Sequence, residues 1–263
     1  MNYETLILSK EEGIATVTLN RPDRMNALTP ESVKELERAI EDVGRDDSIG
    51  VLVITGAGRG FCAGADVKDM VERRQGGPTE GRLAGLRAYY GFIPKLINLE
   101  KPVIASVNGA AVGMGCNLAL ACDIRIASER AGFGEVFVRR GLNVEGGGSY
   151  FLPRLVGMGK ACELIFTGDI IDAKEAERIG LVNRVVPHEQ LQTATRELAS
   201  RIAKGPRVAI GLSKVALYKG GERDLLTALE FEVFAQGVSS QTEDSMEAMR
   251  AFVENREPKF KGR

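Results

Sequence analysis

Short apolar runs that lead into glycine-containing turns recur along the first two thirds of the chain. Ile14–Leu19 alternates in polarity and predicts a β-strand, while residues 51–54 and Val103–Val107 are continuous apolar runs, typical of strands buried on both faces. A helix is predicted from Pro30, because Thr29 can cap its first turn and apolar residues follow at helical spacing. Strands that alternate with helices in this way indicate an α/β fold.

The pattern changes after about residue 187, where the chain is predicted to be almost entirely helical. Two apolar stripes in this part are typical of a helical core or a subunit contact. We therefore predict two regions, a core over residues 1–199 and a helical oligomerisation region over residues 200–263. The stripes consist of Leu225, Leu226, Leu229, Val233 and Phe234, and of Met246, Met249, Phe252 and Val253.

The composition is that of a soluble globular protein and narrows the possible partners. Apolar residues make up 44% and charged residues 27% of the 263 residues. The 35 Lys and Arg residues against 36 Asp and Glu residues give a net charge of -1, which argues against a nucleic-acid partner held by overall basic charge. The uncharged residues 102–122 include too many polar residues and glycines for a membrane span, and no secretory signal is visible. We expect a cytoplasmic protein with no nucleic-acid or membrane partner.

The cysteines and the single histidine argue against a metal site. His188 is the only histidine, and the four cysteines form no C-x-x-C pair, so the chain lacks the usual ligand spacing of a zinc site. We expect no metal, buried free thiols, and chemistry that depends on carboxylates and backbone groups. The cysteines are Cys62, Cys116, Cys122 and Cys162.

Two glycine-rich turns follow two of the predicted buried strands. They are residues 55–66 (TGAGRGFCAGAD) and residues 108–117 (NGAAVGMGCN), and the second leads into an apolar helix. The first turn is not a P-loop, because no Gly-Lys-Ser/Thr follows it, and Phe61 stands where a dinucleotide-binding turn has its third glycine. Glycines let backbone N–H groups approach a ligand closely, and two converging N–H groups make an oxyanion hole.

Taken together, these turns and four further segments resemble the crotonase superfamily, the enoyl-CoA hydratase/isomerase family. The resemblance implies a β-β-α spiral core, a C-terminal helical region that packs trimers or hexamers, and acyl-CoA thioester substrates. It implies no cofactor other than the coenzyme A carried by the substrate. The matching segments are residues 20–28 (NRPDRMNAL), 60–66 (GFCAGAD), 101–110 (KPVIASVNGA), 120–127 (LACDIRIA), 152–157 (LPRLVG) and 176–182 (AERIGLV).

The resemblance also implies where the substrate binds. By position, the thioester carbonyl would accept hydrogen bonds from the backbone N–H groups of Ala63 and Met114, and Met114 departs from the glycine that is usual there. Residues 70–85 are a candidate lid over the acyl end. Coenzyme A would lie along Arg24, Met25, Ala63, Ala65, Asp66, Val67 and Lys68, with Lys259 and Phe260 reaching the coenzyme A of a neighbouring subunit.

The carboxylates decide which reaction of the family is expected. Hydratases of the family use two glutamates, but this chain has Asn117 and Phe137 at those positions. Glu135 lies two residues before the second position, so we expect its side chain to point elsewhere. Glu145 occupies a position that is acidic in some isomerases of the family, including the ring-opening isomerases of phenylacetate degradation, which the segment at residues 254–262 also resembles. Its alternative role is an acidic residue favoured near a helix N-terminus.

One carboxylate is enough to move a proton between two carbons, so the sequence favours an enoyl-CoA isomerase with Glu145 as its acid and base. A first alternative is a hydratase or hydrolase in which Glu145 and Asn117 handle water. A second alternative is a non-catalytic relative that binds coenzyme A or RNA. A dehalogenase is disfavoured because the chain has no tryptophan.

Overall fold

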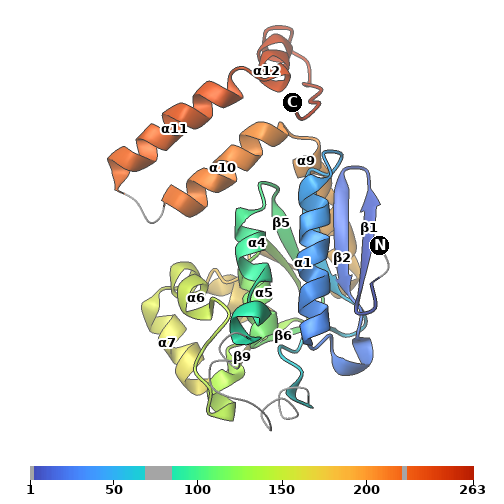
Figure 1. Cartoon of the computed structure of the whole chain (residues 1–263), viewed down its shortest axis with the longest axis vertical. Helices are drawn as coiled ribbons and strands as arrows, with labels where there is room; N and C mark the ends of the chain where they lie inside the picture. The colour runs from blue at the N-terminus through green and yellow to red at the C-terminus, as the bar shows by residue number, and fades with distance from the viewer. Residues whose placement is uncertain (1–2, 69–84, 221–223) are drawn as a thin grey trace.

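The core of the protein is built on two β-sheets that the chain visits in turn (Figure 1). The computed structural model describes residues 3–68, 85–220 and 224–263. The larger sheet has the order β1-β2-β3-β5-β7-β10, in which β1 and β2 are antiparallel and the other pairs are parallel. Its strands are β1 (Leu6–Glu11), β2 (Ile14–Leu19), β3 (Val51–Gly56), β5 (Val103–Val107), β7 (Ile124–Ser128) and β10 (Arg184–Val186).

The smaller sheet consists of three-residue strands in the order β4-β6-β8-β9, parallel except for β8 with β9. In each of the successive pairs β3–β4, β5–β6 and β7–β8, the first strand belongs to the larger sheet and the second to the smaller sheet. Helical structure follows each pair. This repeat is the β-β-α spiral, and the predicted fold class is confirmed. The strands are β4 (Gly60–Cys62), β6 (Ala110–Val112), β8 (Gly132–Gly134) and β9 (Ile170–Asp172).

Helices cover both faces of the larger sheet. On β3, Leu52 and Ile54 pack with α1 (Pro30–Arg45) and α4 (Phe92–Asn98), while Val51 and Val53 pack with α9 (Leu191–Ala203). Successive side chains of a strand point to opposite faces, so burial on both faces explains the continuous apolar run of β3. Thr29 caps α1 by accepting a hydrogen bond from the backbone N–H of Ser32, as the sequence predicts.

Further helices surround the smaller sheet and form the C-terminal part. Those that follow the spiral strands are α5 (Met114–Leu120), α6 (Gly148–Val156), α7 (Met158–Thr167) and α8 (Ala173–Arg178). The 3-10 helices are η1 (Pro22–Arg24), η2 (Val136–Arg140) and η3 (His188–Gln190). The last three helices are α10 (Arg207–Gly220), α11 (Leu225–Ser239) and α12 (Glu243–Val253).

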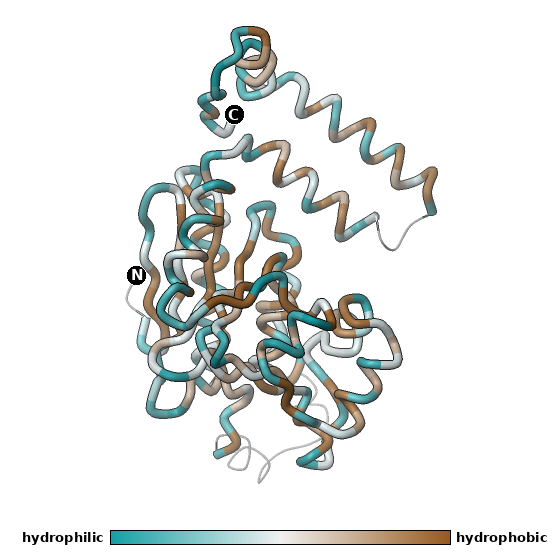
Figure 2. The backbone as a smooth tube through the Cα atoms, turned by 180° about the vertical axis from the view of Figure 1, so that it is seen from behind, coloured by the Kyte–Doolittle hydropathy of each residue, from teal (hydrophilic) through white to brown (hydrophobic). Residues whose placement is uncertain are grey.

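The three last helices extend away from the sheets (Figure 1). Helix α10 is anchored by Lys214, whose buried ammonium group lies 2.9 Å from Asp123 and donates to the carbonyl of Leu96. Helix α11 has no buried residue, although apolar residues run along it (Figure 2). The predicted boundary at residues 199/200 falls inside α9, which packs on the sheet, and we propose a boundary at Gly205, before α10.

The sequence prediction is incomplete at two further points. Residues 70–84 of the candidate lid lie outside the described residues. The apolar helix of the second turn begins at Met114, so the glycine turn contributes its last residues to the helix itself. Within the described ranges, no helix has the length and apolar character needed to cross a membrane.

Candidate active site

The first glycine turn, residues 55–66, is hydrogen-bonded through its backbone to the segment that precedes α1. The N–H of Leu28 donates to the carbonyl of Gly64 at 2.7 Å, and the N–H of Asp66 donates to the carbonyl of Leu28 at 2.9 Å. The N–H of Ala63 donates to the carbonyl of Met25 at 2.9 Å. The Ala63 N–H expected to bind the thioester is therefore already engaged within the fold.

The neighbouring Ala65 presents an N–H group to the site side of this turn. Ala65 forms a parallel bridge with Leu28, and its flanking peptide groups make the bonds of that bridge. Because N–H groups alternate in direction along extended chain, the Ala65 N–H points away from Leu28. Among the described residues, no group accepts a hydrogen bond from it.

The second glycine turn lies directly against the first. Gly64 has a φ of +85°, and a Cβ built on it would lie 2.8 Å from the carbonyl oxygen of Val112 and 3.2 Å from the backbone nitrogen of Met114. A Cβ on Gly115 would lie 2.0 Å from the carbonyl oxygen of Cys62. Glycine is required at both positions because the two backbones touch.

Met114 is the first residue of α5, so its N–H has no partner inside the helix. Its side chain is buried, and a Cβ on Gly146 would lie 2.6 Å from both its Sδ and its Cε atoms. Met114 thus presents its N–H beside the Gly64 turn and packs its side chain under the loop that carries Glu145. The departure from glycine at this position leaves the backbone donor in place.

Glu145 lies half-buried in the loop between η2 and α6 and is held from two sides. The hydroxyl of Tyr90 donates to its Oε2 at 2.5 Å, and the Asn117 Nδ2 donates to its backbone carbonyl at 2.7 Å. Burial and the neighbouring Glu145 carboxylate raise the pKa of the Tyr90 hydroxyl. Gly148 lets the loop approach Asn117, because a Cβ there would lie 2.8 Å from Asn117 Oδ1.

The prediction that Glu135 points elsewhere is wrong. Its carboxyl is buried beside Asn117, whose Nδ2 lies 3.4 Å from Glu135 Oε2. Burial raises the pKa of this carboxyl to about 7, and contacts with the Cys116 thiol and the Asn117 amide offset part of that rise. Glu135 directly precedes η2, so the chain turns its side chain back under α5. Phe137, at the second hydratase position, is buried and apolar.

The residues expected along coenzyme A lie around the first turn. Arg24 and Lys68 are exposed, and cationic side chains of this kind can bind phosphate groups. Met25 accepts a hydrogen bond at its sulfur from Arg59 Nε at 3.1 Å. Asp66 pairs with Arg21 at 3.1 Å, so it braces the turn. Val67 is exposed next to Lys68.

Lys259 and Phe260 are not brought to this turn within one chain. The segment that carries them packs on α12, where the Lys259 N–H donates to Glu247 at 2.9 Å. Arg207 joins this segment to the end of α1, because it donates to the carbonyls of Lys261 and Asp47. The Gly64 turn lies at the start of α1, about 24 Å away along a 16-residue helix.

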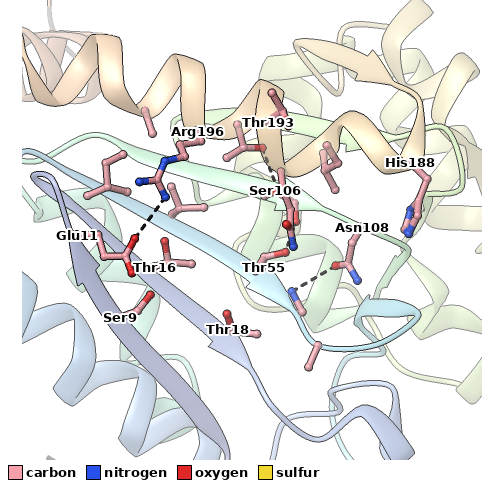
Figure 3. A pocket seen from close by; sticks show the side chains of 18 of the residues that line it. Ser9, Glu11, Thr16, Thr18, Thr55, Ser106, Asn108, His188, Thr193 and Arg196 are labelled. Atoms are coloured by element: carbon pink, nitrogen blue, oxygen red, sulfur yellow. Dashed lines mark hydrogen bonds and ion pairs between the residues drawn. The ribbon is translucent and has the colours of Figure 1, made fainter.

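A cavity of about 760 Å³ lies apart from these residues, between the larger sheet and α9 (Figure 3). Several polar groups that line it are already paired. Thr55 donates to the carbonyl of Ser106, Ser106 bonds to Thr195, and Arg196 lies 3.4 Å from Glu11. No residue expected in the site lines this cavity, so we do not place the reaction there. The described residues contain no His, Cys, Asp and Glu group suited to a metal ion.

Comparisons with known proteins identify the family of this chain. The profile of the enoyl-CoA hydratase/isomerase family matches residues 9–263. The short-chain-enoyl-CoA hydratase of Clostridium acetobutylicum is 45% identical over 257 residues, 97% of each chain. The 1,2-epoxyphenylacetyl-CoA isomerase of Escherichia coli is 36% identical over 260 residues, 99% of each chain. A crystal structure of an enoyl-CoA hydratase subunit from Geobacillus kaustophilus superposes with a TM-score of 0.93 at 38% identity and 99% coverage of both chains. The chain therefore belongs to the enoyl-CoA hydratase/isomerase family of crotonase-fold enzymes.

Proposed function

We propose that this enzyme is an enoyl-CoA isomerase that moves a carbon–carbon double bond along an acyl-CoA thioester. Glu145 removes a proton from the carbon next to the thioester carbonyl, and the electrons move onto the carbonyl oxygen to form an enolate. Glu145 then returns a proton to the carbon at the far end of the original double bond, and the electrons return from the enolate oxygen to form the new double bond next to the carbonyl. The coenzyme A part of the substrate is bound by the enzyme but does not itself react.

The observation that carries this proposal is the pairing of Glu145 with Tyr90. The Tyr90 hydroxyl holds one carboxylate oxygen, at 2.5 Å, and leaves the other for the substrate proton. The hydratase positions, Asn117 and Phe137, carry no carboxylate. An amide can bind water but cannot take its proton, so this arrangement supports a proton shift by a single base.

The enolate oxygen needs two hydrogen-bond donors, and we assign them to Ala65 and Met114. Both N–H groups lie where the two glycine turns touch, and neither is used by the described part of the fold. Donors fixed in advance stabilise the charge that develops in the transition state more than the neutral carbonyl, and loss of one costs about 3 kcal/mol. Ala65 replaces Ala63 in this role.

The proposal is tested by supplying matched 3-enoyl-CoA and 2-enoyl-CoA substrates, one of them cyclic, and separating the products by mass and retention time. We expect positional isomers with wild-type enzyme and their loss with Glu145→Gln. Glu163→Gln, which changes an exposed side chain on helix α7, is the matched control and should retain activity. Isomerisation that survives in Glu145→Gln would refute the assignment of the base.

A hydratase is the second candidate, because relatives such as that of Clostridium acetobutylicum are named as hydratases. In this alternative Asn117 would bind the water and Glu145 would take its proton. Incubation of a 2-enoyl-CoA in oxygen-18 water separates the two candidates. A product heavier by one labelled water supports hydration, and an unlabelled isomer supports the isomerase. The relatives are named as enzymes, which disfavours a non-catalytic binder of coenzyme A or RNA.

We further propose that the enzyme works as a homotrimer or hexamer. Leu226, Phe234 and Phe252 are 73%, 63% and 85% exposed in the single chain, an unfavourable arrangement for large apolar side chains in water. A neighbouring copy that covers them would also explain why Lys259 and Phe260 lie far from the site of their own chain. Light scattering should give a trimer or hexamer for the wild type and for Glu232→Gln, and smaller species for Phe234→Asp. A monomeric wild type would refute the proposal.

A further inference from the structure

Glu135 is a buried carboxyl that the proposed reaction does not use. Its side chain is 2% exposed, at the junction of β8 and η2, under helix α5. No Lys or Arg forms an ion pair with it among the described residues. An ionised carboxylate without a cation is very unfavourable in such a place.

One oxygen of this carboxyl and the amide oxygen of Asn117 are buried without a hydrogen-bond partner among the described residues, and the two side chains are in contact. Within the described part of the chain, Glu135 Oε1 and Asn117 Oδ1 are both unpaired, while the other end of each group joins in the 3.4 Å contact from Asn117 Nδ2 to Glu135 Oε2. Asn117 is itself fully buried. Two acceptor oxygens cannot satisfy one another unless one of them carries a hydrogen.

We propose that Glu135 is protonated in the working enzyme and pairs with Asn117 as a carboxylic acid pairs with an amide. The Asn117 amide donates to Glu135 Oε2, and the added proton on Glu135 donates to Asn117 Oδ1. This one proton satisfies both unpaired oxygens and removes the buried charge. The pairing also fixes which end of the Asn117 amide is the nitrogen.

The pair matters because the second hydrogen of Asn117 Nδ2 holds the carbonyl of Glu145 at 2.7 Å. Glu135 is therefore a positioning residue, which acts through Asn117 on the loop that carries the base. If Glu135 loses its proton, Asn117 Oδ1 loses its hydrogen-bond donor and a negative charge appears under the site where the enolate forms. The role at Glu145 rests on the proposed function, whereas the protonation of Glu135 does not.

Few titratable groups face Glu135. From α5, the Cys116 thiol lies against it, and burial, with a smaller contribution from the Glu135 carboxylate, holds the pKa of that thiol well above its ordinary value. From β7, Arg125 acts on Cys116, and its own donors are directed to the carbonyls of Cys122 and Leu181. Glu145 lies beyond Asn117. The Cys116 thiol is neutral near pH 7, so the proton on Glu135 is the one that changes there.

The protonation is tested first without substrate, by infrared difference spectroscopy of wild type against Glu135→Gln. We expect a carbonyl band of a protonated carboxyl near pH 6 that is lost as the pH rises through about 7. Glu129→Gln, an exposed glutamate, should leave the band unchanged. Absence of the band at pH 6 would overturn the proposal, whatever reaction the enzyme catalyses.

The positioning role is tested by the pH dependence of turnover. Glutamine can both accept from Asn117 Nδ2 and donate to Oδ1, so Glu135→Gln should keep kcat within about threefold and lose the fall in kcat above pH 7. Glu135→Ala should lower kcat at least tenfold with little change in KM. Loss of turnover in Glu135→Gln as complete as in Glu145→Gln would overturn the positioning role, because it would make Glu135 a proton-transfer group. A wild-type kcat that does not change across pH 7, together with the infrared band, would also overturn the positioning role.

Discussion

The substitution Glu135→Gln is expected to change how the stability of the protein depends on pH. The folded state raises the pKa of Glu135 from its ordinary 4.5 to about 7, because burial disfavours the ionised form. Between these two values the folded protein holds a proton that the unfolded chain releases. Stability is therefore lost as the pH rises through this window. At 1.36 kcal/mol per pKa unit, the loss is about 3 kcal/mol in total.

Glutamine has no proton to lose, so the variant should be spared this loss. The free energy of unfolding of Glu135→Gln relative to wild type should rise by about 3 kcal/mol from low pH to pH 8, with most of the change between pH 5 and 7. Urea unfolding followed by circular dichroism at several pH values measures it. The protein concentration must be the same throughout, because an oligomer gains stability with concentration.

Glu129→Gln is the matched control, because it removes an exposed carboxylate of the same type and should show no such trend. The decisive quantity is the change of the difference with pH, since the substitution also alters packing by an amount that does not depend on pH. A difference between Glu135→Gln and wild type that stays constant from pH 5 to 8 would refute the reasoning. It would show that Glu135 keeps an ordinary pKa in the folded protein.

Two further substitutions address the oxyanion hole and the base. Gly64→Ala should lower kcat/KM about 100-fold, because its Cβ would meet the carbonyl of Val112 at 2.8 Å and separate the two donor turns. Gly141→Ala is the control for backbone strain, because Gly141 has a φ of +65° and open space around it. Equal losses of kcat/KM in both variants would contradict the assignment of the donors. Tyr90→Phe should lower kcat about tenfold through loss of one hydrogen bond to the Glu145 carboxylate, with an unchanged melting temperature, and unaltered turnover in this variant would show that Tyr90 does not position the base.

The fold could be predicted from the sequence where strands are long and apolar. The runs that form β2, β3 and β5 carry a clear hydrophobic pattern, and the strands lie where it predicts them. The smaller sheet carries no such pattern, because its strands have three residues each and two of them, β4 and β8, include glycines. The spiral arrangement of the core is expected from the resemblance to the family, because the hydrophobic periodicity does not indicate these short strands.

The catalytic candidates could be predicted only in part. The motifs point to Glu145 and Met114 as candidates, and the structure packs the loop that carries Glu145 against the Met114 side chain. The choice between Ala63 and Ala65 depends on which way a peptide faces, and only the pairing with Met25 and Leu28 decides that. No sequence pattern reports the direction of a single N–H group in a glycine turn.

The contact between Glu135 and Asn117 could not be predicted from the sequence, for a different reason. The two residues are 18 positions apart and belong to different elements, so their approach depends on how η2 leaves the smaller sheet. The sequence alone predicts that the Glu135 side chain points elsewhere, because Glu135 lies two residues before the position of the second hydratase glutamate. The signal that the sequence does carry is a carboxylate directly after the short strand β8, close to a motif position.

The claim that one carboxylate carries the proton is tested most directly by following that proton. A 3-enoyl-CoA with deuterium at C2 is converted in ordinary water under single-turnover conditions, and the product is analysed by mass spectrometry and NMR. A single base at Glu145 returns part of the deuterium to C4 of the 2-enoyl-CoA product, because the same group removes and delivers it. Complete replacement by solvent hydrogen at C4, or a product heavier by one water, would contradict the account.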